Sequence, residues 1–181
     1  ERARRGLSGA VLLGGTATRM GRDKASLPVG GVPAAIRVAR LLEAICDEVL
    51  LVGGSAPPGT PGRAVADPEG PRCALRGLVG ALGAARGERL LVVATDLPRV
   101  TGRLLAGLAV EGPADAVVPR PDLPQPLCAV YRRERALGVA RANLAEGRLA
   151  LRALLERLDV RYVEGASLVA LDPDGHAPAN L

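Results

Sequence analysis

The sequence predicts an α/β protein, a three-layer α/β/α sandwich built around a mostly parallel sheet. Short apolar segments alternate along the chain with segments whose apolar residues recur at helical spacing. The apolar segments are continuous rather than alternating with polar residues, as in strands buried on both faces of a parallel sheet. Alternation of such strands with helices is typical of a sheet covered by helices on both sides.

Seven short apolar segments are the candidate strands, and RLLVVATD, which ends on an aspartate, is the strongest of them. The predicted strands cover residues 9–13, 48–52, 63–67, 89–96, 114–119, 125–131 and 160–163. Four helices are expected between and after them. The first begins near Pro33, the second carries an apolar stripe from Leu75 to Leu82, the third covers residues 101–109, and the fourth begins at Leu144. We expect the tail from residue 172 onward to be loop-like.

Length and composition predict one domain with an aliphatic core. The chain has 181 residues, of which 48% are hydrophobic, but it lacks Phe and Trp and has two Tyr. The formal net charge is +5, with arginines scattered along the chain. Nucleic-acid binding usually needs a concentrated basic surface with aromatic residues for stacking, so we do not expect a nucleic-acid partner. A small acidic substrate such as a nucleotide suits this charge equally well.

No feature of the sequence points to a membrane or to an oxidising compartment. No segment approaches the ~20 apolar residues of a membrane span, and residues 1–6 lack the apolar core of a signal peptide. The three cysteines, Cys46, Cys73 and Cys128, are widely spaced and odd in number, and we expect buried, reduced thiols. These observations predict a cytoplasmic protein without a membrane partner.

Lys24 is the only lysine in a chain whose other basic residues are arginine. It lies in the segment LLGGTATRMGRDKAS (residues 12–26), which follows the first predicted strand. The segment is neither a P-loop, because Gly21 is not followed directly by Lys-Ser or Lys-Thr, nor a G-x-G-x-x-G dinucleotide motif. Ligands of open α/β sheets nevertheless bind beyond the carboxyl ends of the strands, where this segment begins.

The residue types in this segment suit a phosphate ligand. Gly14 and Gly15 allow the backbone to approach phosphate oxygens and donate N–H groups to them. Arg19 and Lys24 would stabilise negative charge that develops on phosphorus and on departing pyrophosphate. Arg19 alone could equally be a solvated surface cation, whereas the composition of the chain makes Lys24 the firmer candidate.

Asp96 and Asp67 each end a predicted strand at the same edge of the sheet. A carboxylate in this position can bind Mg²⁺ that bridges phosphate oxygens. Asp96 could instead cap the following helix, since Pro98 and Thr101 come next. Asp67 could instead be a turn residue before Pro68.

The segment LLGGTATRMGRDK resembles the L-x-G-G-x-x-x-R-M-G-x-D-K signature of the MobA-like nucleotidyltransferases, which usually have alanine in the place of Leu13. ATDLPRV (94–100) resembles the T/C-D-x-P motif of the family, and QPLCAVYRR (125–133) is similar to a segment of its guanylyltransferases rather than of its cytidylyltransferases. DGHAPANL (174–181) is similar to a closing D/N-x-D/N-T-P-x-D-L motif, from which it departs at three of its positions. Together these segments span nearly the whole chain.

The resemblance implies a Rossmann-like sandwich and a Mg²⁺-dependent guanylyltransferase reaction. GMP would pass from GTP to the terminal phosphate of molybdopterin, the organic part of the molybdenum cofactor, with release of pyrophosphate. Residues 1–181 would form one domain, with the nucleotide bound by residues 8–100 and the acceptor by residues 101–181. Further partners would be proteins that deliver the cofactor or mature molybdoenzymes. The alternatives are a cytidylyltransferase acting on molybdopterin or a sugar phosphate, and a catalytically impaired nucleotide-binding relative.

The resemblance also assigns roles to particular residues. Asp96 would bind Mg²⁺ and the nucleotide, Lys24 and Arg19 would be catalytic, and Gln125 and Asp174 would contact the acceptor. Asp67 could select guanine by accepting hydrogen bonds from the base, and Gly53 stands where the family has an asparagine. The expected nucleotide-binding residues are Leu12, Leu13, Gly14, Gly15, Lys24, Gly53, Asp67 and Asp96.

Overall fold

A computed structural model of the chain describes residues 6–14, 28–29, 32–97 and 99–175. Its main feature is a seven-stranded sheet with the strand order β5-β4-β1-β6-β8-β7-β9. The strands are β1 (Leu7–Leu12), β4 (Glu48–Val52), β5 (Arg63–Val65), β6 (Arg89–Ala94), β7 (Ala116–Pro119), β8 (Cys128–Arg132) and β9 (Val160–Val163). All neighbouring strands are parallel except β8, which is antiparallel to both β6 and β7. The predicted mostly parallel sheet is confirmed.

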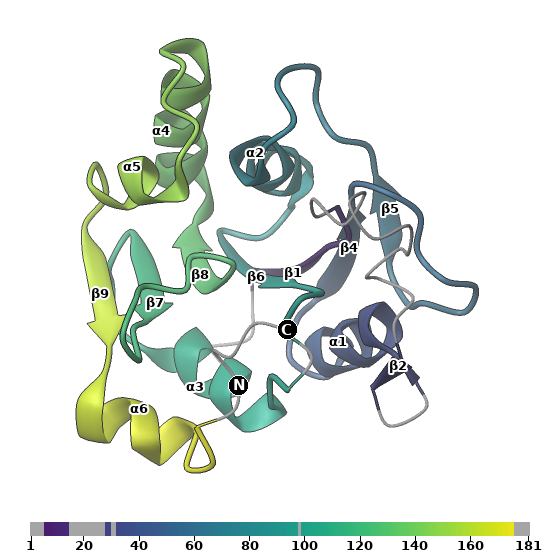
Figure 1. Cartoon of the computed structure of the whole chain (residues 1–181), viewed down its shortest axis with the longest axis vertical. Coiled ribbons are helices and arrows are strands. Elements are labelled where there is room, and N and C mark those ends of the chain that lie inside the picture. The colour runs from purple at the N-terminus through teal and green to yellow at the C-terminus, as the bar shows by residue number, and fades with distance from the viewer. Residues whose placement is uncertain (1–5, 15–27, 30–31, 98, 176–181) are drawn as a thin grey trace.

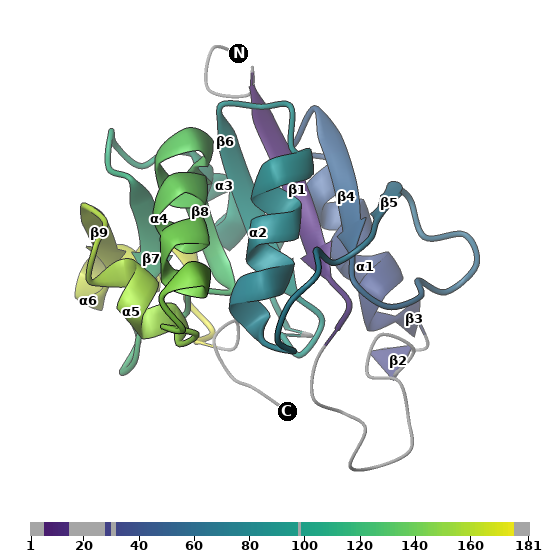
Figure 2. The same ribbon diagram turned by 90° about the horizontal axis from the view of Figure 1, so that it is seen from above.

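Helices cover both faces of the sheet, as Figures 1 and 2 show. The helices are α1 (Ala34–Glu43), α2 (Ala74–Ala84), α3 (Gly102–Val110), α4 (Arg133–Ala145), α5 (Leu151–Leu155) and α6 (Gly165–Leu171). Apolar side chains of α1, α3 and α6 pack with Val11 and Val93 on one face, and those of α2, α4 and α5 pack with Ala10 and Val92 on the other. The three-layer sandwich is therefore confirmed, with one apolar core on each side of the sheet.

The central strand β1 shows why continuous apolar segments predict this arrangement. All six of its residues are buried, including Ser8, because helices cover both of its faces. Gly9 leaves room for α1: a Cβ at this position would lie 3.1 Å from Cβ of Leu42.

Several element boundaries differ from the prediction. The strands predicted at 114–119 and 125–131 begin later, at Ala116 and Cys128, and those predicted to end at Asp67 and Asp96 end two residues earlier. Pro33 is the residue before α1 rather than part of its first turn. Proline or polar residues stand at the ends of these segments, and proline lacks the N–H that strand pairing and helical hydrogen bonding need.

The prediction of a helix starting at Leu144 is wrong. Residue 144 lies in the last turn of α4, and the next helix begins at Leu151. α4 buries mainly small residues, Ala136, Val139 and Ala140, so its apolar stripe is weak amid charged residues. The short helix α6 and the two-stranded pair β2 (Pro28–Val29) and β3 (Val32–Pro33) were also not predicted.

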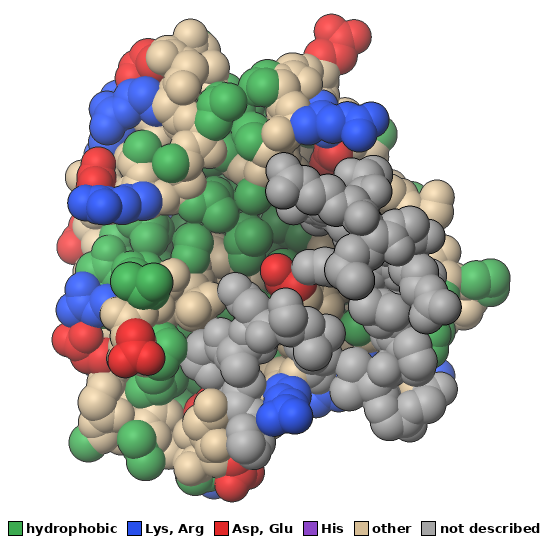
Figure 3. All heavy atoms as spheres, viewed as in Figure 1, with side chains coloured by type: hydrophobic (Ala, Val, Ile, Leu, Met, Phe, Trp, Pro, Cys, Tyr) green, Lys and Arg blue, Asp and Glu red, His purple; other side chains and the backbone are tan. Residues whose placement is uncertain are grey.

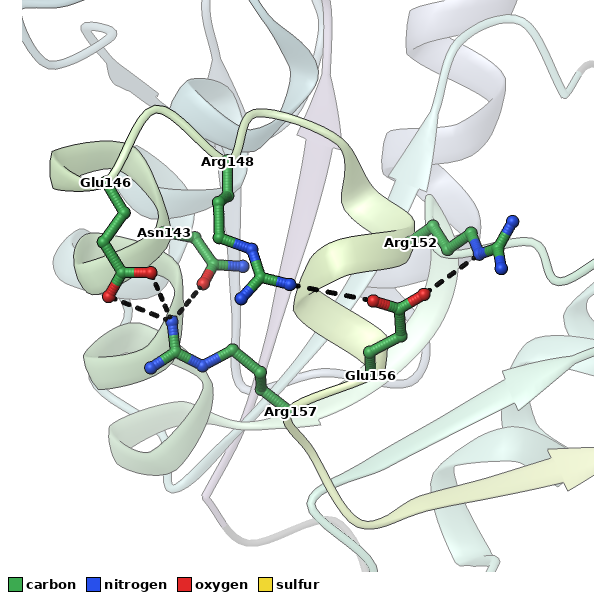
Figure 4. Close-up of polar contacts among 6 residues, drawn as sticks. All are labelled: Asn143, Glu146, Arg148, Arg152, Glu156 and Arg157. Atoms are coloured by element: carbon green, nitrogen blue, oxygen red, sulfur yellow. Dashed lines mark hydrogen bonds and ion pairs between the residues drawn. The ribbon is translucent and has the colours of Figure 1, made fainter.

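A polar cluster joins the end of α4 to α5 and the chain that follows it (Figure 4). The Oδ1 atom of the fully buried Asn143 accepts a hydrogen bond of 2.6 Å from Nη1 of Arg157. The same nitrogen lies 3.1 Å from Oε2 of Glu146. Arg152 and Arg148 pair with Glu156 at the exposed side of the cluster. No helix within the described ranges has both the length and the apolar content needed to cross a membrane.

Candidate active site

The ends of β1, β4 and β6 meet at the carboxyl edge of the sheet, which faces the viewer in Figure 1. The register pairs Leu12 with Val52 on one side and with Ala94 on the other. Adjacent strands lie about 4.8 Å apart, so the residues that follow these three positions leave the sheet side by side. Gly14, Gly53 and Asp96 are therefore brought to one place, as the topology of a parallel sheet predicts.

Backbone and hydroxyl hydrogen bonds hold these strand ends together. The Thr95 N–H donates to the carbonyl oxygen of Leu12 at 3.3 Å, and the Thr95 hydroxyl lies 3.4 Å from the same oxygen. The Leu13 N–H donates to Val52 at 2.9 Å. These hydrogen bonds connect the end of β1 to the ends of β4 and β6.

Two glycine turns, at Gly14 and at Gly53–Gly54, lie at this edge. A Cβ at Gly14 would meet no atom of the described residues within 4 Å, so this part of the chain leaves room for a ligand to approach the backbone there. Gly53 and Gly54 both have positive φ, +67° and +66°, which favours glycine at these positions. Gly15, Arg19 and Lys24 lie outside the described residues, and their predicted roles stay predictions.

Asp96 follows β6 in a half-buried position at this edge. The alternative that it caps α3 is wrong, because the cap is Thr101, whose Oγ1 accepts a hydrogen bond of 3.2 Å from the Leu104 N–H. Among the described residues the Asp96 carboxylate has no hydrogen-bond or ion-pair partner. No group in this part of the chain therefore competes with a ligand for the Asp96 carboxylate.

The donor set fits a magnesium ion that is held partly by substrate. In the described part of the chain no three His, Cys, Asp or Glu residues form a group that could hold a metal alone. Mg²⁺ commonly uses one or two carboxylates together with substrate phosphates and water. Asp96 suits this pattern, with phosphate oxygens supplying the remaining ligands.

Asp67 lies beside Gly53, which follows β4, and contacts α2. Its Oδ2 pairs with Nη2 of Arg76 at 3.1 Å, and a Cβ at Gly53 would lie 3.0 Å from its Oδ1. Asp67 therefore does not act only as a turn residue before Pro68, since it forms an ion pair with Arg76 of α2, nine positions along the chain. Sequence reasoning missed Arg76 because arginines occur throughout this chain and none stands out by composition.

The loop that carries Gln125 lies next to the end of β6. The Gln125 N–H donates to Pro119 and its carbonyl accepts from Cys128, both at 3.0 Å. The Tyr131 hydroxyl donates to the Pro126 carbonyl at 2.6 Å, and the Leu127 carbonyl accepts from the Ala94 N–H at 2.9 Å. Burial raises the pKa of Tyr131, so the phenol keeps the proton that it donates.

The surface near this loop is apolar. Figure 3 shows hydrophobic side chains gathered between α2 and the α4–α5 pair, next to the ends of β6 and β8. The half-buried Leu127 and Leu151 pack against the core cluster of this face. Such a surface can accept the flat, uncharged part of a ligand whose phosphate lies nearer the glycine turns.

Asp174 is exposed in the turn after α6. Within the described residues no hydrogen bond or ion pair joins it to Asp96, Asp67 or Gln125, and its contact with the acceptor stays a prediction. The buried carboxylate of Asp172 is close enough to Cys128, at the start of β8, to affect its titration. Burial, with a smaller contribution from Asp172, raises the pKa of the Cys128 thiol to about 12.

The cysteines match their predicted role only in part. Cys128 is fully buried, whereas Cys46 and Cys73 are partly exposed, and all three are free thiols. Burial raises the pKa of Cys46 to about 12, with Asp47 adding to the effect. A thiol with so high a pKa is protonated and inert at neutral pH.

Comparison with known proteins identifies the family. The model of the MobA-like NTP transferase domain matches residues 9–162. The "Probable molybdenum cofactor guanylyltransferase" of Chloroflexus aggregans is 38% identical over 152 residues, which are 78% of this chain and 72% of that protein. The molybdenum cofactor guanylyltransferase of Desulfosudis oleivorans is 30% identical over 174 residues, 93% of this chain and 86% of that protein.

Solved structures show the same fold. Molybdopterin-guanine dinucleotide biosynthesis protein A from Archaeoglobus fulgidus has a TM-score of 0.79 at 22% identity, covering 96% of this chain and 91% of that one. The 2-C-methyl-D-erythritol 4-phosphate cytidylyltransferase of Thermus thermophilus has a TM-score of 0.68 at 19% identity, covering 88% and 89%. Together with the match over residues 9–162, these findings show that the chain belongs to the MobA-like NTP transferase family.

Proposed function

We propose that this chain transfers GMP from GTP to the terminal phosphate of molybdopterin. The observation that carries the proposal is the convergence of Gly14, Asp67 and Asp96 at one edge of the sheet in a chain whose relatives are molybdenum cofactor guanylyltransferases. Gly14 offers backbone for a triphosphate, and Asp67 offers a carboxylate for a base. Asp96 offers a metal ion a carboxylate that has no partner among the described residues. The apolar surface between α2 and the α4–α5 pair supports binding of the pterin ring system there.

The reaction needs no nucleophile from the protein. A terminal phosphate oxygen of the acceptor attacks the α-phosphorus of GTP and forms a new P–O bond. The bond from the α-phosphorus to the bridging oxygen of the β-phosphate breaks, and its electron pair leaves with pyrophosphate. The contribution of the chain is positioning and charge stabilisation, as in other phosphoryl and nucleotidyl transfers.

Each residue has a defined task in this scheme. Asp96 would hold Mg²⁺, which neutralises charge on the phosphate oxygens when bound. Lys24 and Arg19 would offset the charge on the departing pyrophosphate. Leu12, Leu13, Gly14 and Gly15 would line the nucleotide, with Gly53 contributing backbone in place of a side chain. Gln125 and Asp174 would contact the acceptor.

Thermal-shift titrations with GTP, CTP and ATP, each with Mg²⁺, test the nucleotide preference. GTP is expected to raise the melting temperature most, because at equal concentration the ligand that binds most tightly stabilises the folded state most. Stabilisation by CTP and not by GTP would instead favour a cytidylyltransferase. Pyrophosphate release with GTP and molybdopterin then tests catalysis, and GTP binding without release would indicate an inactive nucleotide-binding protein.

A further inference from the structure

Arg76 and Asp67 form a partly buried ion pair beside the proposed nucleotide site. Nη2 of Arg76 lies 3.1 Å from Oδ2 of Asp67, with side-chain exposures of 18% and 28%. Nη1 of Arg76 donates a 2.7 Å hydrogen bond to the carbonyl oxygen of Gly70, between β5 and α2. The planar guanidinium is thereby tied at two points, which holds it in one orientation.

The Asp67 carboxylate occupies space that glycine leaves open at position 53. A Cβ at Gly53 would lie 3.0 Å from Oδ1 and 3.1 Å from Oδ2 of Asp67, and a Cβ at Gly77 would lie 3.7 Å from Oδ1. The space of a side chain at position 53 is thus taken by the carboxylate itself. The ion pair with Arg76 holds the carboxylate in this space.

The ion pair uses only part of the hydrogen-bonding capacity of Asp67. An ionised carboxylate has about four acceptor sites, and Arg76 occupies one of them on Oδ2. Within the described ranges no donor reaches Oδ1. A base that offers two adjacent N–H donors, as guanine does with N1–H and its exocyclic amine, matches the remaining acceptors.

We infer that Arg76 is a positioning residue for base recognition, an inference that rests on the proposed guanylyltransferase function. Arg76 holds Asp67 oriented so that the carboxylate accepts from both N–H groups of guanine. Without Arg76, the Asp67 carboxylate would remain in the site but its side chain would adopt other rotamers as well. Removing Arg76 would therefore weaken nucleotide binding and base discrimination and would leave the rate of the transfer step unchanged.

Pyrophosphate-release kinetics with GTP and ITP test this role, since the base of ITP keeps N1–H but lacks the exocyclic amine. For Arg76→Met we expect KM for GTP to rise about 10-fold or more, the effect of one charged hydrogen bond, with kcat close to that of the parent. The ratio of kcat/KM for GTP over ITP should fall toward one. Arg76→Lys, which keeps the charge but not the fork, should restore both quantities in part.

A double-mutant cycle shows whether Arg76 acts through Asp67. If it does, adding Arg76→Met to Asp67→Asn costs no further loss in kcat/KM for GTP, because the positioned group is already altered. Arg72→Met is the matched control: this exposed arginine lies on the same connection and has no ion-pair partner in the described part of the chain. It should leave KM and the GTP/ITP ratio unchanged.

Each outcome decides the matter. A folded Arg76→Met protein with parental KM and GTP/ITP ratio, or strictly additive losses in the cycle, would overturn the role of Arg76 while the guanylyltransferase function stands. If the parent neither binds GTP nor releases pyrophosphate, the proposed function and this inference fall together. Should Arg76→Met not fold, Arg76→Gln takes its place under the same criteria, with folding checked by circular dichroism.

Discussion

The Thr101 hydroxyl accepts the Leu104 N–H at 3.2 Å and so caps α3 five residues after Asp96. This relationship separates two tasks that the sequence leaves ambiguous between neighbouring polar residues. Thr101 is the helix cap, and the Asp96 carboxylate accepts no hydrogen bond from the described residues. A substitution at Asp96 should therefore lower activity with little change in stability, and a substitution at Thr101 should lower stability with little change in activity.

We expect Asp96→Asn to lower the rate of pyrophosphate release about 100-fold or more, since a bound metal ion contributes several kcal/mol of charge stabilisation. The Mg²⁺ concentration for half-maximal rate should rise, while the melting temperature changes little. Thr101→Ala should instead lose about 1 kcal/mol of unfolding free energy and keep its activity. An Asp96→Asn protein with parental rate and Mg²⁺ dependence would remove Asp96 from the metal site.

Lys24→Ala should lower the rate of pyrophosphate release with GTP and molybdopterin about 100- to 1,000-fold, the usual effect of losing one charge-stabilising group. Arg22→Ala is the matched control, because it removes a cation two positions away in the same segment. Steady-state assays of both proteins provide the comparison. Equal rates for Lys24→Ala and the parent would exclude Lys24 from the mechanism.

Gly53→Ala should weaken GTP binding as well as stability. The new Cβ would lie 3.0 Å from Oδ1 of Asp67, and alanine at φ +67° costs about 1 kcal/mol or more. Gly59→Ala is the control for strain alone, since φ is +81° there and a Cβ would meet no atom of the described residues within 4 Å. Both variants should have a lower melting temperature than the parent, but only Gly53→Ala should raise KM for GTP. The same KM in both variants would contradict the contact with Asp67.

Arg157→Met should lower the unfolding free energy by about 1–3 kcal/mol, because Oδ1 of the fully buried Asn143 would lose its donor. Arg152→Met provides the contrast within the cluster of Figure 4. Its side chain is 89% exposed, and surface ion pairs contribute about 0–1 kcal/mol. Urea unfolding measures both changes, and a loss in Arg152→Met as large as in Arg157→Met would refute this ranking.

Glu48 should make stability depend on pH in the acid range. Burial alone would raise its pKa, but hydrogen bonds from the Ser8 hydroxyl and the Arg86 N–H, with help from Arg63, bring the pKa below its ordinary value. A lowered carboxyl pKa stabilises the folded state above the unfolded-state value, about 4.3, and this contribution is lost as pH falls through the folded pKa. Glu48→Gln should therefore have a lower melting temperature than the parent at pH 7, and the difference between the two melting temperatures should shrink toward pH 3. A difference independent of pH would contradict this role.

Local patterns carried most of the fold prediction, and their failures have physical causes. The strand segments were recognisable because burial on both faces requires continuous apolar residues, as in β1. α4 was misplaced because it packs on α2 through alanines, which leave no strong apolar stripe. Strand ends were overextended at Asp67 and Asp96, where polar residues leave the ladder before the predicted boundary.

The sequence by itself determined the fold class, the family and the strand ends at which Gly14 and Asp96 lie, because apolar continuity and glycine turns are local properties. Only the tertiary structure decided which of these ends become neighbours. Leu12 and Thr95, 83 positions apart, share a hydrogen bond because β6 inserts beside β1, and Asp67 meets Arg76 because α2 folds back over β4. Such pairings follow from the order in which strands and helices pack against one another, which no short segment of the chain encodes.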